Sequence, residues 1–139
     1  MFSRKRLTLA RERRGLTGIQ LSERSGITAI TISRLESGQT KQPDDSTIER
    51  LADALDYPVP FFHKDDPEEL DTEIVSFRSL KKMNAKERNA ALWAGSLGLE
   101  IYDWIEKEYH LPAPSIPELR GNDDPENVAR LVRQKWGIG

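Results

Sequence analysis

The sequence predicts an all-α protein. Several stretches begin at a residue type that caps helices, repeat apolar side chains every three or four residues, and end at a glycine or proline. Only residues 72–78 partly alternate in the manner of a short strand or an extended arm. We therefore expect a helical domain over residues 1–63, a polar linker over 64–84 and a helical association region over 85–139.

The first two predicted helices are short and have clear limits. Ser3 has the character of an N-cap, and the helix after it runs to about Arg14, where Gly15 ends it. Thr17 and Gln20 have the spacing of a capping box, in which each side chain bonds to the other residue's backbone. The second helix follows them and ends near residues 25–26.

The third predicted helix completes a helix-turn-helix pattern. Thr28 caps it, and Gly38 ends it after Ser37. Ile32 and Leu35 share its buried face. Two short helices joined by a tight turn with glycine are typical of this motif, and such a helix fits the major groove of DNA.

Two further helices close the first domain. Ser46 and Glu49 fit a capping box, with Asp44 and Asp45 as other candidate caps. A stripe of apolar side chains then repeats at helical spacing: Ile48, Leu51, Ala52 and Leu55. Pro60 can begin a last short helix that carries Phe61 and Phe62, which we expect to cover the core.

The association region is predicted to contain a long helix and a short one. Asn84 caps the long helix, which runs from Ala85 to Tyr109, and one face of it carries Ala90, Ala94, Leu97, Ile101 and Ile105. So broad an apolar surface must be covered by the last helix, by a second copy of the chain, or by both. The last helix starts with Asp124 and Pro125 and ends at Gly137.

Charge is distributed unevenly along the chain. The total is −2, but residues 1–43 hold nine basic and three acidic side chains, a net +6 that leaves −8 for the remainder. A basic segment on an acidic protein indicates either a nucleic-acid footprint or a solvated face.

The composition excludes several classes of protein. The chain has no cysteine and only two histidines, His63 and His110, so disulfides, thiolate metal sites and histidine-rich metal sites are excluded. No apolar run reaches the ~20 residues of a membrane span, and there is no secretory signal. Because a phosphate loop and a nucleophile–base set are also missing, we expect a soluble cytoplasmic protein that is not an enzyme and binds no cofactor or metal.

Residues 11–55 resemble the Cro/repressor-type helix-turn-helix family, also called the XRE family. The residues that carry the resemblance are Arg11, Gly15-Leu16-Thr17, Leu21, Gly26-Ile27-Thr28, Ile32-Ser33, Leu35-Glu36-Ser37-Gly38, Pro43, Ile48, Leu51-Ala52 and Ala54-Leu55. The resemblance extends over about residues 4–62 and implies a five-helix DNA-binding domain whose recognition helix is residues 28–37.

The resemblance also implies roles for individual residues. Base-reading positions fall on Ala29, Ile30, Ser33 and Arg34, where Arg34 suits guanine, and Ala29 and Ile30 either touch thymine methyls or simply pack. Contacts to the DNA backbone are implied for Thr17, Gly18, Thr28, Thr31, Gln39, Lys41 and Gln42. The family also links its first helix to its recognition helix through a partly buried ion pair, which maps onto Arg11 and Glu36. The alternative is that these two are unrelated surface charges.

The second half resembles the connecting segment of XRE–ImmA/IrrE regulators, in which a zinc-peptidase-like domain follows. The resemblance rests on residues 76–80, the long helix, residues 111–119 and residues 124–139. The zinc motif H-E-x-x-H is absent, so peptidase activity does not carry over. We expect either a fragment that ends before that domain or a naturally short relative.

Together these features predict a sequence-specific transcriptional regulator, in particular a repressor. It would bind double-stranded DNA as a homodimer that associates through residues 85–109, in the cytoplasm of a bacterium or of a phage host, at the nucleoid when bound. One alternative is an antitoxin that neutralises a partner protein and binds its own operator. Another is a temperate-phage immunity repressor.

Overall fold

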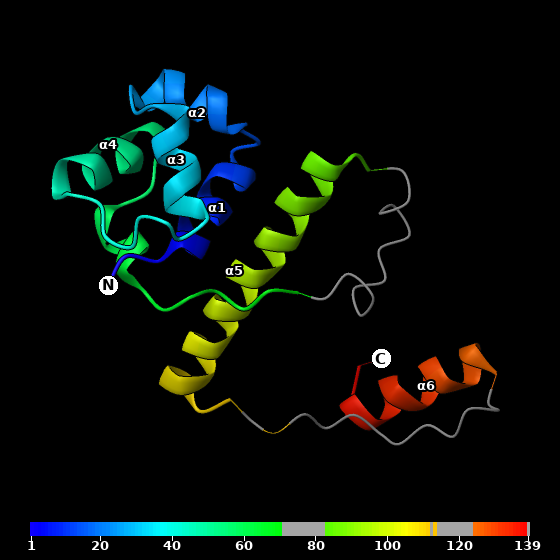
Figure 1. Cartoon of the computed structure of the whole chain (residues 1–139). Coiled ribbons are helices and arrows are strands. Elements are labelled where there is room, and N and C mark those ends of the chain that lie inside the picture. The colour runs from blue at the N-terminus through cyan, green and yellow to red at the C-terminus, as the bar shows by residue number, and fades with distance from the viewer. Residues whose placement is uncertain (71–82, 112, 114–123, 139) are drawn as a thin grey trace. The chain divides into compact units, whose positions relative to one another are not determined.

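The computed structural model describes residues 1–70, 83–111, 113 and 124–138, and these are helical with no strand, as predicted. The helices are α1 (Arg4–Arg13), α2 (Gly18–Ser25), α3 (Ala29–Glu36), α4 (Asp45–Leu55), the 3₁₀ helix η1 (Val59–His63), α5 (Ala85–Tyr109) and α6 (Pro125–Trp136) (Figure 1). The chain divides into two compact units, residues 1–104 and 105–139, and α5 runs across the division. The predicted short strand or extended arm at 72–78 lies outside the described residues, as do residues 76–80, 112 and 114–119 of the segments that carry the second resemblance.

The first three helices begin at the predicted caps. The side chains of Ser3, Thr17 and Thr28 each accept a hydrogen bond from the backbone N–H three residues later, and Thr17 with Gln20 forms the full capping box. Gly26 follows α2 in the left-handed region, at a φ of 66°, where a residue with a side chain would be strained. Local sequence therefore determines where these helices start and stop.

The predicted capping box at the start of α4 is wrong. Asp44 is the N-cap, because its carboxylate accepts hydrogen bonds from the Thr47 backbone N–H and from the hydroxyls of Thr47 and Ser46. These three bonds, the backbone one first, hold the pKa of Asp44 below its ordinary value of 3.8. Ser46 lies inside the helix and donates to the cap, since a carboxylate accepts more bonds than a hydroxyl can.

One core joins α1, α2, α3, α4 and η1. Phe61 and Phe62 cover it as predicted, and Phe2 stacks on Phe62 with ring centroids 6.4 Å apart. The other buried apolar side chains are Leu7, Leu9, Ala10, Leu21, Ile27, Ile32, Leu35, Ile48, Leu51, Ala52 and Leu55. Leu9 is fully buried although it lies on a different side of α1 from Leu7 and Ala10, so α1 is covered on more than one face.

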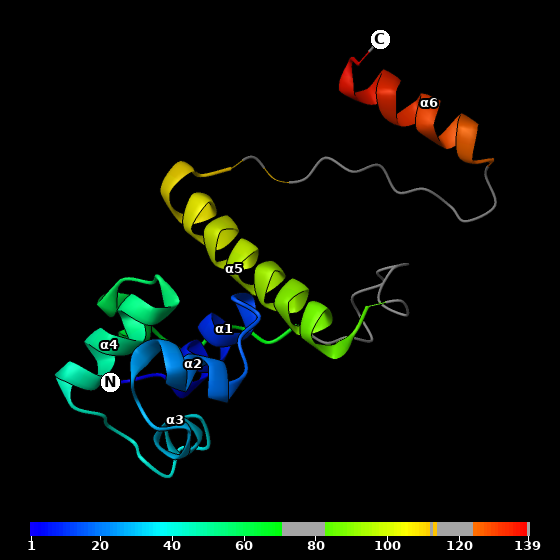
Figure 2. The ribbon, with the colours of Figure 1, turned by 90° about the horizontal axis from the view of Figure 1, so that it is seen from above.

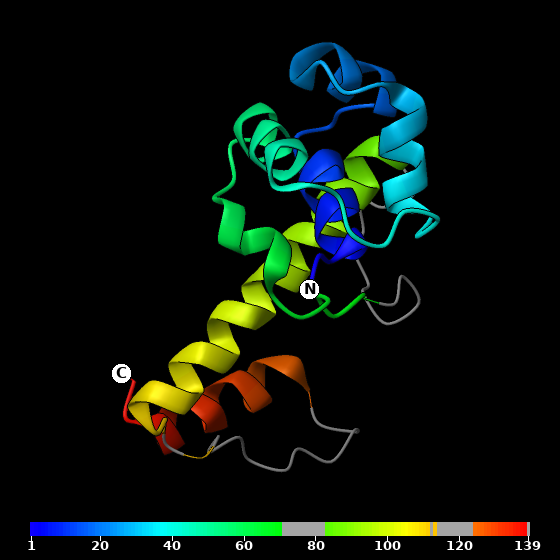
Figure 3. The same ribbon diagram turned by 60° about the vertical axis from the view of Figure 1, so that its left-hand side comes forward.

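The part of α5 in the first unit packs along α1 (Figure 3). The helix begins at the predicted cap, where Asn84 and Glu87 exchange side chain-to-backbone hydrogen bonds. The face that packs on the first unit differs from the predicted stripe, because Ser96 is buried and Trp93 and Leu97 pack against the core, while Ala94 and Ile101 of the stripe are exposed in the single chain. Hydrogen bonds between α5 and α1 determine which face of α5 packs on the first unit. The spacing of apolar residues in the sequence does not predict these polar contacts.

In the second unit, α6 forms with the predicted limits. The Asp124 carboxylate accepts from the Asn127 backbone N–H, and Gly137 ends the helix in the left-handed region. Among the described residues, no helix combines the length and the apolar character that crossing a membrane requires.

Candidate nucleic-acid interface

A tight turn fixes the crossing of α2 and α3. Within it the Ser25 hydroxyl donates to the Leu21 carbonyl and accepts from the Ile27 backbone N–H, and Ile27 is buried between the helices. Arg50 on α4 donates from Nε to the Ser25 carbonyl at 3.0 Å, which satisfies the end of α2. These contacts hold the two helices as one rigid element.

The two faces of α3 have opposite character. Ile32 and Leu35 are buried, whereas Ile30 is 66% exposed and Ser33 and Arg34 are also exposed. Figure 2 shows α3 at the edge of the unit, with α1 between it and α5. Of the four residues predicted to read bases, Ala29 alone is partly covered. The outward face is therefore free to meet a large ligand.

The residues predicted to contact the DNA backbone lie at two places beside α3. Thr17 and Gly18 begin α2, and Gln39, Lys41 and Gln42 follow α3; all but Gly18 are exposed, and Gly18 is half-buried. At the start of α3 the hydroxyls of Thr28 and Thr31 lie 2.9 Å apart. The Gln42 side-chain oxygen accepts from the Phe2 backbone N–H at 3.3 Å, and the amide NH₂ of this exposed residue keeps its two donors for a ligand.

The basic segment is less available than its composition indicates. Six of its nine basic side chains bond within the protein: Arg4, Lys5, Arg6, Arg11, Arg13 and Arg14. Lys5, for example, pairs with Glu69 at 2.8 Å, and this hydrogen bond raises the pKa of Lys5. Within the described residues, Arg24, Arg34 and Lys41 are exposed without an intramolecular ion pair or hydrogen bond.

Three arginines bond to the carboxyl ends of helices, a role that sequence reasoning missed. Arg4 donates to the Ser37 carbonyl after α3 at 3.1 Å. Arg14 donates to the Leu55 carbonyl of α4 at 2.7 Å. Arg50 donates to the last carbonyl of α2, as described above. The last carbonyls of a helix lack partners within the helix and carry partial negative charge, so a guanidinium there is doubly favourable.

Arg11 and Glu36 form an ion pair that ties α1 to the end of α3. Arg11 Nε donates to Glu36 Oε1 at 2.7 Å and Nη2 to Oε2 at 3.2 Å, while Nη1 donates to the Leu16 carbonyl. The side chains are only 15% and 20% exposed. Glu12 lies 3.6 Å from the same guanidinium. The arrangement fixes the outward face of α3 against the rest of the unit.

Arg6 holds the unit together on its other side. The guanidinium, 4% exposed, donates to the Asp65 carbonyl and to both oxygens of Glu100 on α5, and it lies over the Phe61 ring at 5.0 Å. A basic residue near the N-terminus carries no sequence signal that it will be buried. Only the fold, which brings residues 65 and 100 to α1, shows this.

No group of three side chains among the described residues is placed to hold a metal ion. What the site offers is an exposed helix face with one free arginine, flanked by hydroxyls, amides and a lysine. Such groups bond to phosphate oxygens and to base edges.

Comparisons with known proteins agree with this geometry. Residues 7–62 match the family model described as helix-turn-helix. The HTH-type transcriptional repressor RghR of Bacillus subtilis (strain 168) is 46% identical over 52 residues, which are 37% of this chain and 38% of that protein. The match thus spans well under half the length of the curated relative. No solved structure matches the chain.

Proposed function

We propose, from the premise that residues 7–62 are a domain of the helix-turn-helix family, that this chain is a sequence-specific DNA-binding transcriptional regulator that acts as a repressor. The observation that carries the proposal is the outward face of α3, which is anchored by Arg11 and on which Arg34 has no hydrogen bond or ion pair to any of the residues that the structure describes. It would act in the cytoplasm, at the nucleoid of a bacterium or of a phage host.

Recognition begins with α3 in the major groove. The groove admits one α-helix, and a helix held by Ile32 and Leu35 can present its other side to the base edges. Arg34 donates two hydrogen bonds to guanine O6 and N7, a contact worth ~1–3 kcal/mol of discrimination. Ile30 and the partly covered Ala29 touch thymine methyls, and Ser33 bonds to either kind of base pair.

Contacts to the DNA backbone set the register of α3. Thr17 and Gly18, at the start of α2, contact the phosphate backbone of one DNA strand. Thr28 and Thr31 contact the DNA backbone from the start of α3. On the other side are Gln39, Lys41 and Gln42. These contacts carry little sequence information, but they fix the angle at which α3 enters the groove.

Electrostatic attraction comes from few side chains. Six of the nine basic residues are used inside the protein, and Arg24, Arg34 and Lys41 have no ion pair or hydrogen bond to the described part of the chain. Because Arg34 is assigned to guanine, Arg24 and Lys41 remain to neutralise phosphates. Each neutralised phosphate contributes a slope of about −0.9 to log affinity against log salt, so we expect a slope of about −2 per subunit. A basic surface of nine free cations would give a much steeper slope.

A homodimer would place two copies of α3 on half-sites about 34 Å apart. We assign residues 1–63 to DNA reading, 64–84 to linkage and 85–139 to association. Within residues 85–109 the contact would lie toward the end of α5, where Leu99, Ile101 and Tyr102 are exposed. Ile101→Asp should then convert the dimer to a monomer in sedimentation, whereas Ile19→Asp, at an equally exposed isoleucine of α2, should not.

Selection of sites from random duplexes at two salt concentrations tests the function. We expect one recovered motif, in two copies spaced by one helical turn, and weaker binding at the higher salt. Recovery of unrelated sequences at both concentrations would contradict sequence-specific reading.

A further inference from the structure

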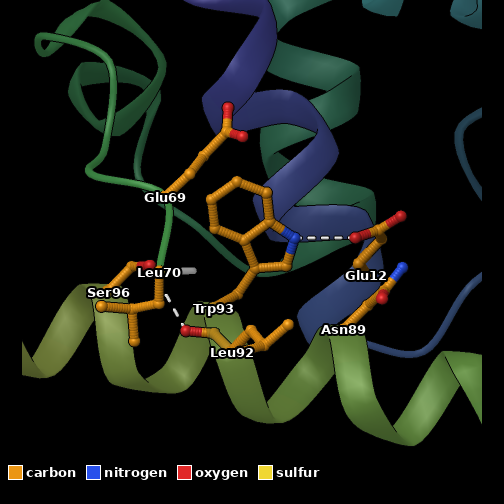
Figure 4. A pocket seen from close by; sticks show the side chains of 7 residues that line it. All are labelled: Glu12, Glu69, Leu70, Asn89, Leu92, Trp93 and Ser96. Atoms are coloured by element: carbon orange, nitrogen blue, oxygen red, sulfur yellow. Dashed lines mark hydrogen bonds between the residues drawn. The ribbon is translucent and has the colours of Figure 1, made fainter. Parts of the chain in front are cut away.

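A small cavity lies where α1, residues 69–70 and α5 meet, away from α3. Seven residues line it: Glu12, Glu69, Leu70, Asn89, Leu92, Trp93 and Ser96 (Figure 4). Its volume is about 170 Å³. A cavity of about 150 Å³ holds a benzene molecule, so this one has room for a ligand of about six to eight heavy atoms.

The chemistry of the lining favours a cation with a short apolar body. Two carboxylates, Glu12 and Glu69, flank the indole of Trp93, and no lining residue is basic (Figure 4). Leu70 and Leu92 supply apolar surface. The buried Ser96 hydroxyl already donates to the Leu92 carbonyl of its own helix.

Both carboxylates retain acceptor capacity although each has a partner. Glu12 Oε2 accepts from the Trp93 indole N–H at 2.7 Å, and Glu69 Oε1 pairs with Lys5 at 2.8 Å. A carboxylate offers about four lone-pair sites, so each can accept further N–H bonds from an ammonium group. No basic side chain lines the cavity to bond to an anion, so an anion is disfavoured.

We propose that this cavity is the effector site of the regulator and that it binds a small primary amine with a short apolar chain. The inference rests on the proposed function for its regulatory part, because an effector needs a DNA-binding activity to control. The ammonium group bonds to Glu12, Glu69 adds negative charge from the other side of the Trp93 indole, and the apolar chain lies against Trp93 and Leu92.

A series of hydrogen bonds and ion pairs connects this cavity to the recognition helix. Trp93 on α5 donates to Glu12 on α1, Glu12 lies 3.6 Å from Arg11, and Arg11 holds Glu36 at the end of α3. A bound ammonium uses the remaining lone pairs of Glu12 and so places a second positive charge beside the Arg11 guanidinium, where like charges repel. The amine therefore disturbs the ion pair that positions α3, and by thermodynamic linkage DNA and amine weaken each other's binding.

Binding is tested on the full chain without DNA. The probe is isopentylamine, with isopentanol and isovalerate as neutral and anionic analogues of the same shape. The readout is the NMR signal of the Trp93 indole N–H, assigned with Trp93→Phe. We expect the amine to shift this signal saturably and the carboxylic acid not to bind. The alcohol should bind at least ten-fold more weakly than the amine, because a hydrogen bond to a charged group is worth ~1.5–3 kcal/mol.

Charge-removing variants test whether the amine binds at this cavity or responds to the loss of any negative charge on the protein. Glu12→Gln keeps an acceptor for Trp93 but removes the charge, and should weaken amine binding about ten-fold; Glu69→Gln gives a second test if the first variant is unstable. Glu49→Gln, at an exposed carboxylate on α4, is the matched control and should bind as the parent does. Equal binding of amine and alcohol, or unchanged binding in both site variants, would overturn the proposal.

The regulatory part is tested by measuring affinity for the selected operator with and without saturating isopentylamine. We expect affinity to fall about five-fold or more, within the usual range of coupling between sites. Amine binding that leaves operator affinity unchanged would overturn the effector role. If the protein without amine bound no duplex, that result would instead contradict the proposed function. The NMR titration would still test whether the cavity binds the amine.

Discussion

Removing Glu36 should destabilise the first unit and weaken DNA binding together. In the parent the Arg11 guanidinium makes two bonds to Glu36, and both side chains are at least four-fifths covered. Glu36→Ala leaves this charge largely buried and without its main partner. Such a loss in a buried pair typically costs ~3–5 kcal/mol of unfolding free energy.

The structure places the expected cost below that range. Arg11 still donates to the Leu16 carbonyl after the substitution, and Glu12 at 3.6 Å can move toward the freed nitrogen atoms. We therefore expect a loss of about 2–3 kcal/mol. For a unit of this size that corresponds to a fall in Tm of about 8–15 °C.

The assay is thermal and urea unfolding followed by circular dichroism, with operator affinity measured well below the Tm. Glu49→Ala, at an exposed residue of α4, is the control and should stay within about 0.5 kcal/mol of the parent. Arg11→Met with Glu36→Ala should cost less than the sum of the two single changes, because the double variant leaves no unpaired charge. An unchanged Tm in Glu36→Ala, or strict additivity in the cycle, would refute the reasoning.

Three further predictions concern the helices. Gly98→Ala should stabilise the chain by about 0.5–1 kcal/mol, because Gly98 is exposed inside α5 and a methyl group there meets no atom within 4 Å. Gly95→Ala should gain less or lose stability in the same melts, since its methyl must displace the Leu70 side chain; a gain as large as that of Gly98→Ala would contradict this packing. Asp44→Asn should lower Tm more at pH 7 than at about pH 2. The pKa of Asp44 is lowered in the folded protein, so its charge contributes stability above the ordinary value of 3.8, and this contribution is lost as the pH falls through the lowered pKa. An equal effect at both pH values would show that the charge of Asp44 contributes nothing.

Features set by neighbouring residues could be predicted from the sequence. The caps at Ser3, Thr17 and Thr28 depend on bonds that span three residues, and the structure has all of them. The buried face of α3 followed from the spacing of Ile32 and Leu35. The start of α4 was the exception, because Asp44 and Ser46 are both good caps and the choice depends on how many bonds each can accept.

Features set by residues far apart in the sequence could not be predicted. The sequence shows Arg6 and Arg14 only as members of a basic segment, whereas the structure uses them for Glu100 and for the end of α4. The face of α5 that packs on α1 is likewise chosen by the bond from Trp93 to Glu12, at a separation of 81 residues. Charge counting therefore overstated how many basic side chains of residues 1–43 are unpaired, and it missed the contact between α5 and α1.

The most direct test of base reading by α3 compares Arg34→Ala with Arg24→Ala on the selected operator and on its single-base variants. If Arg34 reads guanine, its loss should relax preference at one base position by ~1–3 kcal/mol, while Arg24→Ala weakens all sequences alike. A uniform loss in Arg34→Ala would make Arg34 a phosphate contact and contradict the account.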